Sequence, residues 1–319
     1  MKRSSVVAIL VMVGLLAGCA APAAAPSTNG ELKGTITASG AFALYPLMVK
    51  WGEEFQKLHP DVQFDISAGG AGKGMTDALA GQVDIGMVSR EIKADEEKQG
   101  AYWVSVTKDA VFGIVNAKNP VLAELKSKGI TRQALIDIYI TGKIKTWGEV
   151  VGKPEITDEI HVYTRSDAAG APETWAKYLD NKKQEDLLGV GVFGDPGITD
   201  AVAKDPLSIG YNNLGYAYDA TSGNPITGID VLPIDVKADG QVDANETITT
   251  KAQAIAAVAA GHYPSPPARA LNVVTKGKPS GLVQAFILWT LTDGQQFVDS
   301  AGYIPLTKAL LDDGVAKLK

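Results

Sequence analysis

Cysteine and histidine are both scarce in this chain of 319 residues, and their scarcity excludes several kinds of chemistry. Cys19 is the only cysteine, so no disulfide can form within the chain. The histidines are His59, His161 and His262. None of them stands in a nucleophile–base pattern, and the sequence has no Gly-x-Ser-x-Gly elbow. The sequence therefore favours binding over catalysis, and a hydrolase is only a remote alternative.

Positive charge and long hydrophobic runs are lacking as well. Asp and Glu total 36 against 30 Lys and Arg, for a net charge of −6. This balance argues against a nucleic-acid partner and against polybasic membrane binding. The apolar stretch from Val6 to Leu16 is too short to cross a hydrocarbon core, which needs roughly 20 residues. Because Lys2 and Arg3 precede it, the stretch predicts a secretory signal peptide over residues 1–18.

Cys19 closes the run Leu16-Ala17-Gly18-Cys19, which resembles the bacterial lipobox. In that motif the thiol takes a diacylglycerol and becomes the first residue of the mature protein. An ordinary signal peptide with an incidental cysteine is the alternative. Residues 19–30 are small and uncharged, as in a flexible leash. We therefore expect an exported protein, lipid-anchored through Cys19 to the cell membrane and facing the periplasm or the cell exterior.

Strand-like and helix-like segments alternate along the rest of the chain. The strand pattern of Leu32–Ala38 precedes a helix pattern over Leu44–Leu58. The same succession recurs at Ile160–Arg165 and Pro172–Leu179, and a long helix is predicted over Gly281–Ser300. Such alternation predicts an α/β fold with mainly parallel sheets and flanking helices.

Turns rich in small residues follow several of the predicted strands. They read Ser39-Gly40-Ala41-Phe42, Gly69-Gly70-Ala71-Gly72-Lys73-Gly74 and Arg165-Ser166-Asp167-Ala168-Ala169-Gly170. Free N–H groups at a helix start, at the positive end of the helix dipole, form a ready anion site. The second turn is not an NTPase phosphate loop, because Gly74 and Met75 follow Lys73 where Lys-Ser or Lys-Thr is needed. The turns together predict a site for a small anion.

The order of these motifs resembles the substrate-binding proteins of phosphate ABC transporters. The resemblance runs from about residue 34 to residue 218, and the chain matches more loosely after that. Its most specific part is the run from Thr141 to Trp147, Thr-Gly-Lys-Ile-Lys-Thr-Trp. The other matching runs are Ser39–Leu47, Gly69–Gly74, Val83–Glu91, Arg165 with the following turn, and Ser208–Tyr211.

The resemblance implies a two-lobed periplasmic-binding-protein fold of type II. Two crossing segments would join the lobes, with the anion in the cleft between them and closure on binding. We expect lobe 1 at 31–115 plus 230–319 and lobe 2 at 116–229. The implied partners are a small oxyanion, such as phosphate, and an ABC permease with its ATPase. We expect a monomer without a cofactor, and the alternative function is a sensory or adhesive lipoprotein that keeps the fold without transport.

The binding loops of the family carry over with departures at three positions. Phe42 stands where the family has a hydroxyl residue, and Ala169 and Ala171 replace the hydroxyl residues of a Gly-Ser-Gly-Thr pattern. Lost hydroxyl donors change which ligand is preferred, so the resemblance indicates an anion receptor and leaves open whether the anion is phosphate. The expected ligand-binding residues are Ser39, Gly40, Ala41, Phe42, Gly72, Lys73, Ser89, Arg90, Arg165, Ser166, Asp167, Ala169, Gly170 and Ala171.

Several of these residues also have simpler interpretations. Arg90 and Arg165 are cleft cations or surface ion pairs, and Lys73 is a ligand or a solvated loop lysine. Asp167 is either a helix cap or, like Glu91, an acceptor for the proton of a phosphate. The ring of Phe42 belongs to the core or to the wall of the site.

An acidic segment near residue 240 is spaced like a calcium-binding loop. Asp235, Asp239, Asp243 and Glu246 supply oxygens at loop positions one, five, nine and twelve, with Gly240 at position six. Lys237 occupies position three, where an oxygen ligand belongs. The alternatives are a calcium site and an acidic turn between a strand and a helix.

Overall fold

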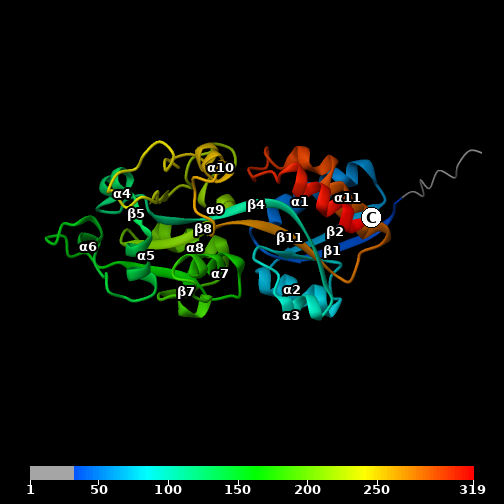
Figure 1. The fold of residues 1–319 in the computed structure, drawn as a ribbon, viewed down its shortest axis with the longest axis horizontal. Coiled ribbons are helices and arrows are strands. Elements are labelled where there is room, and N and C mark those ends of the chain that lie inside the picture. Colours follow the sequence, from blue (N-terminus) through cyan, green and yellow to red (C-terminus); the bar gives the residue numbers. More distant parts are fainter. Residues whose placement is uncertain (1–31) are drawn as a thin grey trace, which may run out of the picture. The chain divides into compact units, whose positions relative to one another are not determined.

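The structure, a computed structural model, describes residues 32–319, and nine of its strands form one mixed sheet (Figure 1). Its strand order is β2-β1-β3-β11-β4-β8-β6-β7, with β9 also paired to β4. The signal peptide, Cys19 and the leash lie outside the described residues. Within the described part, no helix is long and apolar enough to span a membrane.

The first strands form parallel pairs with helices between them. β1 pairs in parallel with both β2 and β3. Helix α1 confirms the predicted helix at this place, because Pro46 lies in its first turn and Leu47, Trp51 and Phe55 are buried on one stripe. The elements are β1 (Gly34–Gly40), α1 (Tyr45–Leu58), β2 (Val62–Ala68), α2 (Ala71–Ala80), β3 (Ile85–Val88) and α3 (Ala94–Lys98).

A second parallel set lies in the middle of the sequence. β6 pairs in parallel with β7 and β8, and the short strands β5 and β10 form a separate parallel pair. The elements are α4 (Leu122–Lys128), β5 (Ile130–Thr131), α5 (Arg132–Tyr139), α6 (Trp147–Val151), β6 (His161–Arg165), α7 (Gly170–Tyr178), η1 (Gln184–Asp186), β7 (Val190–Val192), α8 (Gly194–Lys204), β8 (Ser208–Asn213), α9 (Leu214–Ala217), β9 (Ile229–Val231), β10 (Ile234–Asp235) and α10 (Lys251–Ala259).

Two long strands connect the two parallel sets. β4 (Ala101–Asn116) pairs with β11 (Ala268–Lys276) along its first part and with β8 and β9 along its second part. Every antiparallel pairing between the named strands of the described chain involves β4 or β11. These strands are therefore the crossing segments between two parallel α/β layers. The chain then ends with α11 (Gly281–Leu291), η2 (Asp293–Phe297) and α12 (Lys308–Leu318).

The buried apolar side chains form two clusters, one on each side of the crossing. One cluster draws on residues 36–106 and 271–318, and the other on 110–263 together with Ile304. Below, lobe 1 and lobe 2 denote the elements packed around these two clusters. Residues 231–263 pack in the cluster of lobe 2, although the sequence division assigns them to lobe 1.

Candidate functional site

The predicted loops of lobe 1 are joined by backbone hydrogen bonds at the carboxyl ends of their strands. The carbonyl oxygen of Gly40 accepts the N–H groups of Gly69 and Gly70 at 2.9 and 3.0 Å, and the N–H of Ala41 donates to Met87 at 2.9 Å. A Cβ on Gly40, whose φ is +132°, would lie 2.3 Å from the Met87 carbonyl oxygen. Only glycine fits this crowded, left-handed position.

The loop at the end of β6 meets this group from lobe 2. The N–H of Gly72 donates to the carbonyl oxygen of Ala168 at 3.1 Å. A Cβ on Gly170 would lie 2.2 Å from the Ser89 carbonyl oxygen. The structure therefore brings together the loops at residues 39–42, 69–74, 89 and 165–171, which are far apart in the sequence.

Helix starts from both lobes present backbone N–H groups at this junction. Phe42 and Ala43 precede α1, and Gly170 and Ala171 open α7. Within residues 32–319, the N–H groups of these four residues donate no hydrogen bond. Neither helix has a side-chain cap. The free donors and the positive ends of both helix dipoles suit an anion.

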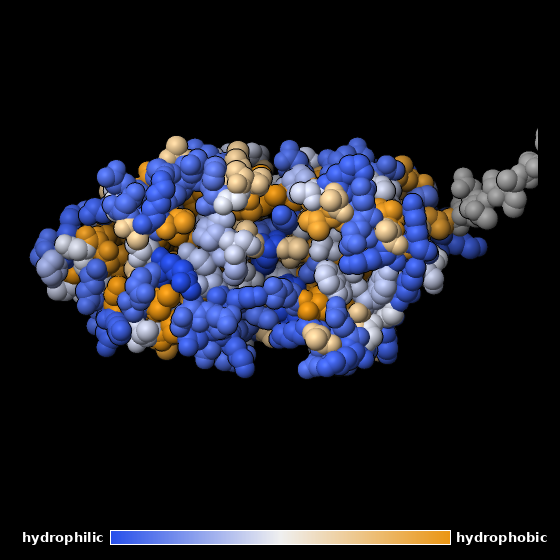
Figure 2. Space-filling model, in the orientation of Figure 1, coloured by the Kyte–Doolittle hydropathy of each residue, from blue (hydrophilic) through white to orange (hydrophobic). Residues whose placement is uncertain are grey.

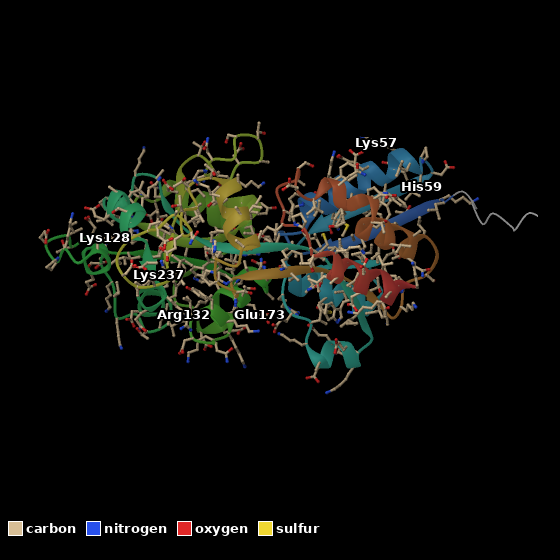
Figure 3. All side chains as sticks on the ribbon, turned by 45° about the horizontal axis from the view of Figure 1, so that its top comes forward. Lys57, His59, Lys128, Arg132, Glu173 and Lys237 are labelled. Atoms are coloured by element: carbon tan, nitrogen blue, oxygen red, sulfur yellow. The ribbon has the colours of Figure 1, made fainter. Side chains whose placement is uncertain are left out.

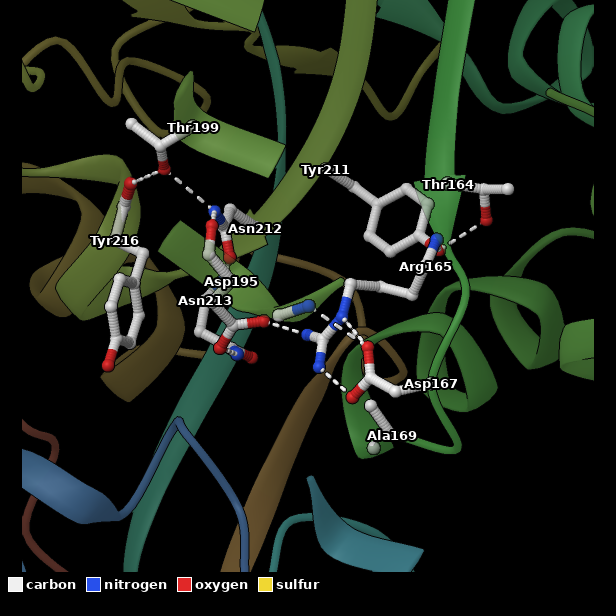
Figure 4. Close-up of polar contacts among 12 residues, drawn as sticks. Thr164, Arg165, Asp167, Ala169, Asp195, Thr199, Tyr211, Asn212, Asn213 and Tyr216 are labelled. Atoms are coloured by element: carbon white, nitrogen blue, oxygen red, sulfur yellow. Dashed lines mark hydrogen bonds and ion pairs between the residues drawn. The ribbon is translucent and has the colours of Figure 1, made fainter. Parts of the chain in front are cut away.

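Arg165 lies at the end of β6, and its side chain is only 1% exposed. Nε and Nη2 donate to the two carboxylate oxygens of Asp167 at 2.7 and 2.5 Å, and Nη1 donates to Asp195 (Figure 4). Burial opposes the charge of Arg165, but the two carboxylates outweigh it and raise the arginine pKa. Burial likewise opposes the charge of Asp167, and Arg165 outweighs it and lowers the pKa of that carboxyl. Arg165 and Asp167 are therefore both charged.

The ring of Phe42 crosses from lobe 1 to cover this ion pair. The Arg165 guanidinium carbon lies 5.4 Å from the Phe42 ring centroid, within cation–π range. Phe193 and Tyr216 of lobe 2 meet the same ring edge-on at centroid distances of 6.1 and 6.5 Å. Phe42 thus packs as a wall of the junction between the lobes, over Arg165.

The sequence reasoning missed a second set of buried polar residues behind Arg165. Asp195 lies at the start of α8. One of its carboxylate oxygens accepts a hydrogen bond from Arg165, and the other accepts one from the Asn213 side-chain amide. The Asn213 oxygen accepts from Arg269, which also faces Asp109. Burial raises the pKa of Asp195. In the sequence, the only sign of this buried polar set is that single polar residues, such as Asp109 in β4, interrupt otherwise apolar strands.

Other predicted cations are already paired with carboxylates. Arg90, whose side chain is 8% exposed, contacts Glu96 at 2.7 Å and Glu173 of lobe 2 at 3.2 Å. Lys73 pairs with Asp77, which also accepts the Ser39 hydroxyl at 2.6 Å. These side chains lie near the junction, but their charges are neutralised locally.

The remaining predicted residues divide by exposure. Ser166 is exposed, while Ala169 and Ala171 are buried. Glu91, the other expected proton acceptor, pairs with Lys177 of α7 at 2.7 Å.

A cavity of about 1090 Å³ between the lobes is lined by residues that include Gly72, Arg90, Ala168 and Ala169. In the space-filling view, hydrophilic residues are spread over both halves of the visible face, and hydrophobic residues form smaller patches among them (Figure 2).

The calcium-like loop uses its carboxylates to hold its own backbone. Asp235, Asp239, Asp243 and Glu246 each accept backbone N–H groups of the loop, and Asp243 pairs with Lys237. Among residues 32–319, no three His, Cys, Asp or Glu side chains are grouped to hold a metal ion.

Two α/β lobes, two crossing strands and glycine-rich strand ends that meet between the lobes define a two-lobed binding protein. Residues 25–294 match the family model of the PBP superfamily domain. The chain therefore belongs to the PBP (periplasmic-binding-protein) superfamily, which confirms the predicted fold class.

Relatives and solved structures agree with this assignment. The phosphate-binding protein PstS of Bacillus subtilis (strain 168) is 29% identical over 322 residues, 96% of each chain. A crystal structure from Clostridium perfringens, described as a phosphate ABC transporter substrate-binding protein with bound phosphate, superposes with a TM-score of 0.70. It is 25% identical and covers 86% of this chain and 100% of its own. An ABC-type phosphate transport receptor of Vibrio cholerae, 19% identical, shares the fold with a TM-score of 0.61, covering 85% of this chain and 100% of its own.

Proposed function

We propose that this protein is an extracytoplasmic receptor that captures a small oxyanion, phosphate or a close relative, and delivers it to an ABC importer. The observation that carries the proposal is the pair of uncapped helix starts, α1 from lobe 1 and α7 from lobe 2, whose free N–H groups lie at one junction beside Arg165. The relatives named for phosphate binding support the choice of ligand class. The mechanism is binding and closure, without chemistry on the ligand.

Backbone donors carry more of the binding here than side chains. Arg165 shares its charge between Asp167 and Asp195, and Arg90 and Lys73 are paired with carboxylates. No hydroxyl side chain stands at positions 42, 169 and 171. The ligand is therefore held by N–H groups and helix dipoles, with Arg165 as a shared cation. Asp167 is the acceptor beside the helix starts for an oxyanion that carries a proton, which disfavours an unprotonated anion such as sulfate.

Closure of the lobes involves ion pairs between the 90–93 segment of lobe 1 and α7 of lobe 2. Glu173, labelled in Figure 3, forms ion pairs with Arg90 at 3.2 Å and with Lys93 at 3.6 Å. Lys177, one helical turn later, pairs with Glu91 at 2.7 Å. Because each pair joins the two lobes, these contacts stabilise the closed arrangement that the ligand selects.

We also propose that a lipid on Cys19 anchors the protein to the cell membrane. The proposal rests on the run Leu16-Ala17-Gly18-Cys19 after a short apolar stretch. Cys19→Ser should move the protein from the detergent phase to the aqueous phase of a detergent extraction, whereas Ser27→Ala, the control in the same leash, should not. Retention of Cys19→Ser in the detergent phase would contradict the lipid anchor.

A thermal-shift panel tests the proposed function. The purified protein is heated with phosphate, phosphite, phosphonates, arsenate, sulfate, molybdate and small carboxylates. A ligand at a hundred times its dissociation constant stabilises the folded state by about 2.7 kcal/mol, so phosphate or a related oxyanion should raise the melting temperature clearly. No response to any of these anions would reject the receptor function and favour a sensory or adhesive lipoprotein.

A further inference from the structure

Arg269 and Asp109 form a buried pair where the two crossing strands pass between the lobes. Arg269 of β11 and Asp109 of β4 are direct partners in the antiparallel ladder. Their side chains are 7% and 1% exposed, and Arg269 Nη2 lies 3.6 Å from Asp109 Oδ2. The other oxygen of Asp109 accepts the N–H of Leu214, at the start of α9, at 3.2 Å.

The guanidinium of Arg269 reaches from the crossing strand into the first turn of α7. Nη1 donates to the Gly170 carbonyl oxygen at 2.5 Å and to the Thr174 hydroxyl at 2.9 Å. Gly170 and Ala171 also carry the free N–H groups of lobe 2. Arg269 therefore holds the helix start that presents those groups to an anion.

A chain of hydrogen bonds connects Arg269 to Arg165 as well. Arg269 Nη2 donates to the Asn213 oxygen, the Asn213 amide donates to Asp195, and Arg165 donates to the other oxygen of Asp195. Asp195, Asn213 and Arg165 are all buried (Figure 4). Arg269 is thus connected by hydrogen bonds to both anion-binding elements of lobe 2, the start of α7 and Arg165.

Two atoms of the Arg269–Asp109 pair lack hydrogen-bond partners. Arg269 Nε and Asp109 Oδ2 are buried and make no hydrogen bond within residues 32–319. A buried polar atom without a partner costs stability, and a charged one costs more. The pair is therefore poorly explained as a device for stability alone.

We propose that Arg269 is a positioning residue for the anion-binding site and that Asp109 holds it in place. The inference rests on the proposed function. When the crossing strands take the arrangement seen here, Arg269 aligns the N-terminal turn of α7 and, through Asn213 and Asp195, the guanidinium of Arg165. Movement of the strands on opening would disturb both elements together, which links lobe closure to affinity.

The test is calorimetric titration of inorganic phosphate into the full-length protein and its variants. Arg269→Gln should weaken affinity at least tenfold. Arg269→Lys should weaken it at least fivefold, because an unbranched ammonium cannot reach Gly170, Thr174 and Asn213 at once. The control is Lys276→Gln, which removes the same charge at the exposed end of the same strand and should stay within twofold of the wild type.

A double-variant cycle separates positioning from a general loss of packing. If Arg269 acts through Arg165, the combined variant Arg269→Gln/Arg165→Lys should lose less affinity than the product of the two single losses. A full product would overturn the route through Arg165, and wild-type affinity in Arg269→Gln would overturn the positioning role altogether.

A milder variant covers the case in which Arg269→Gln fails to fold. Asn213→Ser breaks only the link from Arg269 to Asp195 and should weaken phosphate binding at least threefold, and unchanged affinity would again overturn the proposal. Failure of the wild type to bind phosphate would instead overturn the proposed phosphate function and this inference with it.

Discussion

Gly170 stands against Ser89 so closely that a Cβ on the glycine would lie 2.2 Å from the Ser89 carbonyl oxygen and 2.3 Å from its hydroxyl oxygen. Gly170 opens α7 in lobe 2, and Ser89 follows β3 in lobe 1. A single hydrogen at this position is thus what allows the two lobes to meet. Backbone atoms cannot move aside as a flexible side chain can, so the contact depends on glycine.

Gly170→Ala should therefore hinder closure without unfolding either lobe. We expect phosphate affinity to fall at least tenfold, because the methyl group separates α7 from the 89–90 segment. Gly215→Ala is the matched control, since a Cβ on Gly215 meets nothing within 4 Å. Calorimetric titration measures both variants, and equal affinity in Gly170→Ala and wild type would show that the lobes bind the anion without this contact.

Arg165 is expected to matter for stability as well as for binding. Its removal by Arg165→Ala leaves Asp195, 1% exposed, without its counter-ion. Breaking such a buried pair typically costs about 3–5 kcal/mol. Urea unfolding should show a loss of this size, and Arg165→Ala/Asp195→Asn should recover part of it. An Arg165→Ala variant as stable as the wild type would mean that Asp195 finds another partner.

The ion pairs between α7 and the 90–93 segment should make affinity depend on salt. Glu173→Gln removes the acceptor of Arg90 and Lys93, and we expect about fivefold weaker phosphate binding at low ionic strength, equivalent to about 1 kcal/mol. The difference should shrink at high salt. Glu185→Gln, at an exposed residue of the same cavity with no ion pair within residues 32–319, is the control. If the difference in affinity between Glu173→Gln and the wild type does not change with salt, these ion pairs do not contribute to closure through electrostatic attraction.

The sequence was informative where structure is decided locally. Glycine-rich turns marked the strand ends that meet at the junction. Thr131, a residue type that favours N-caps, caps α5, and its hydroxyl accepts the Ala134 N–H at 3.1 Å. The helix predicted over 281–300 instead stops at Leu291. A short 3₁₀ segment follows, in which the Gly294 carbonyl accepts the Trp51 indole N–H at 2.8 Å. A partner that distant in sequence leaves no local signal.

Separation along the sequence also explains why the buried polar residues behind Arg165 were not predicted. Asp195 lies in the first turn of α8, next to Pro196, and the pattern of its own segment does not indicate that Arg165 and Asn213 are its partners. Arg269 and Asp109 became visible as a pair only when the register of β4 and β11 placed them opposite each other. Pairings between strands so far apart cannot be read from one sequence.

Asp109 should make the folded protein less stable as the pH rises from about 4 to about 6, which is the opposite of the usual effect of a carboxyl group. Burial raises the pKa of this carboxyl from 3.8 to about 6, and the attraction of Arg269 opposes the rise without cancelling it. The other charged or titratable groups that influence Asp109 are Asp195 of α8, Lys251 of α10 and Tyr303 of the loop before α12. Between about pH 4 and 6, Asp109 therefore carries a proton in the folded protein, whereas the same carboxyl group has lost its proton in the unfolded chain.

The stability that comes from this proton is complete below pH 4 and is lost as the pH rises through 6, because a raised folded-state pKa favours folding only while the group is protonated. The shift of about two pKa units corresponds to about 3 kcal/mol. Asp109→Asn should be free of this slope, so its stability relative to the wild type should increase from pH 4 to pH 7. Urea unfolding across this range measures the difference, in which the carboxylates common to both proteins cancel. The same substitution at the exposed Asp299 is the control and should leave the difference flat. A constant difference for Asp109→Asn would show that Asp109 does not change its protonation on folding in this range.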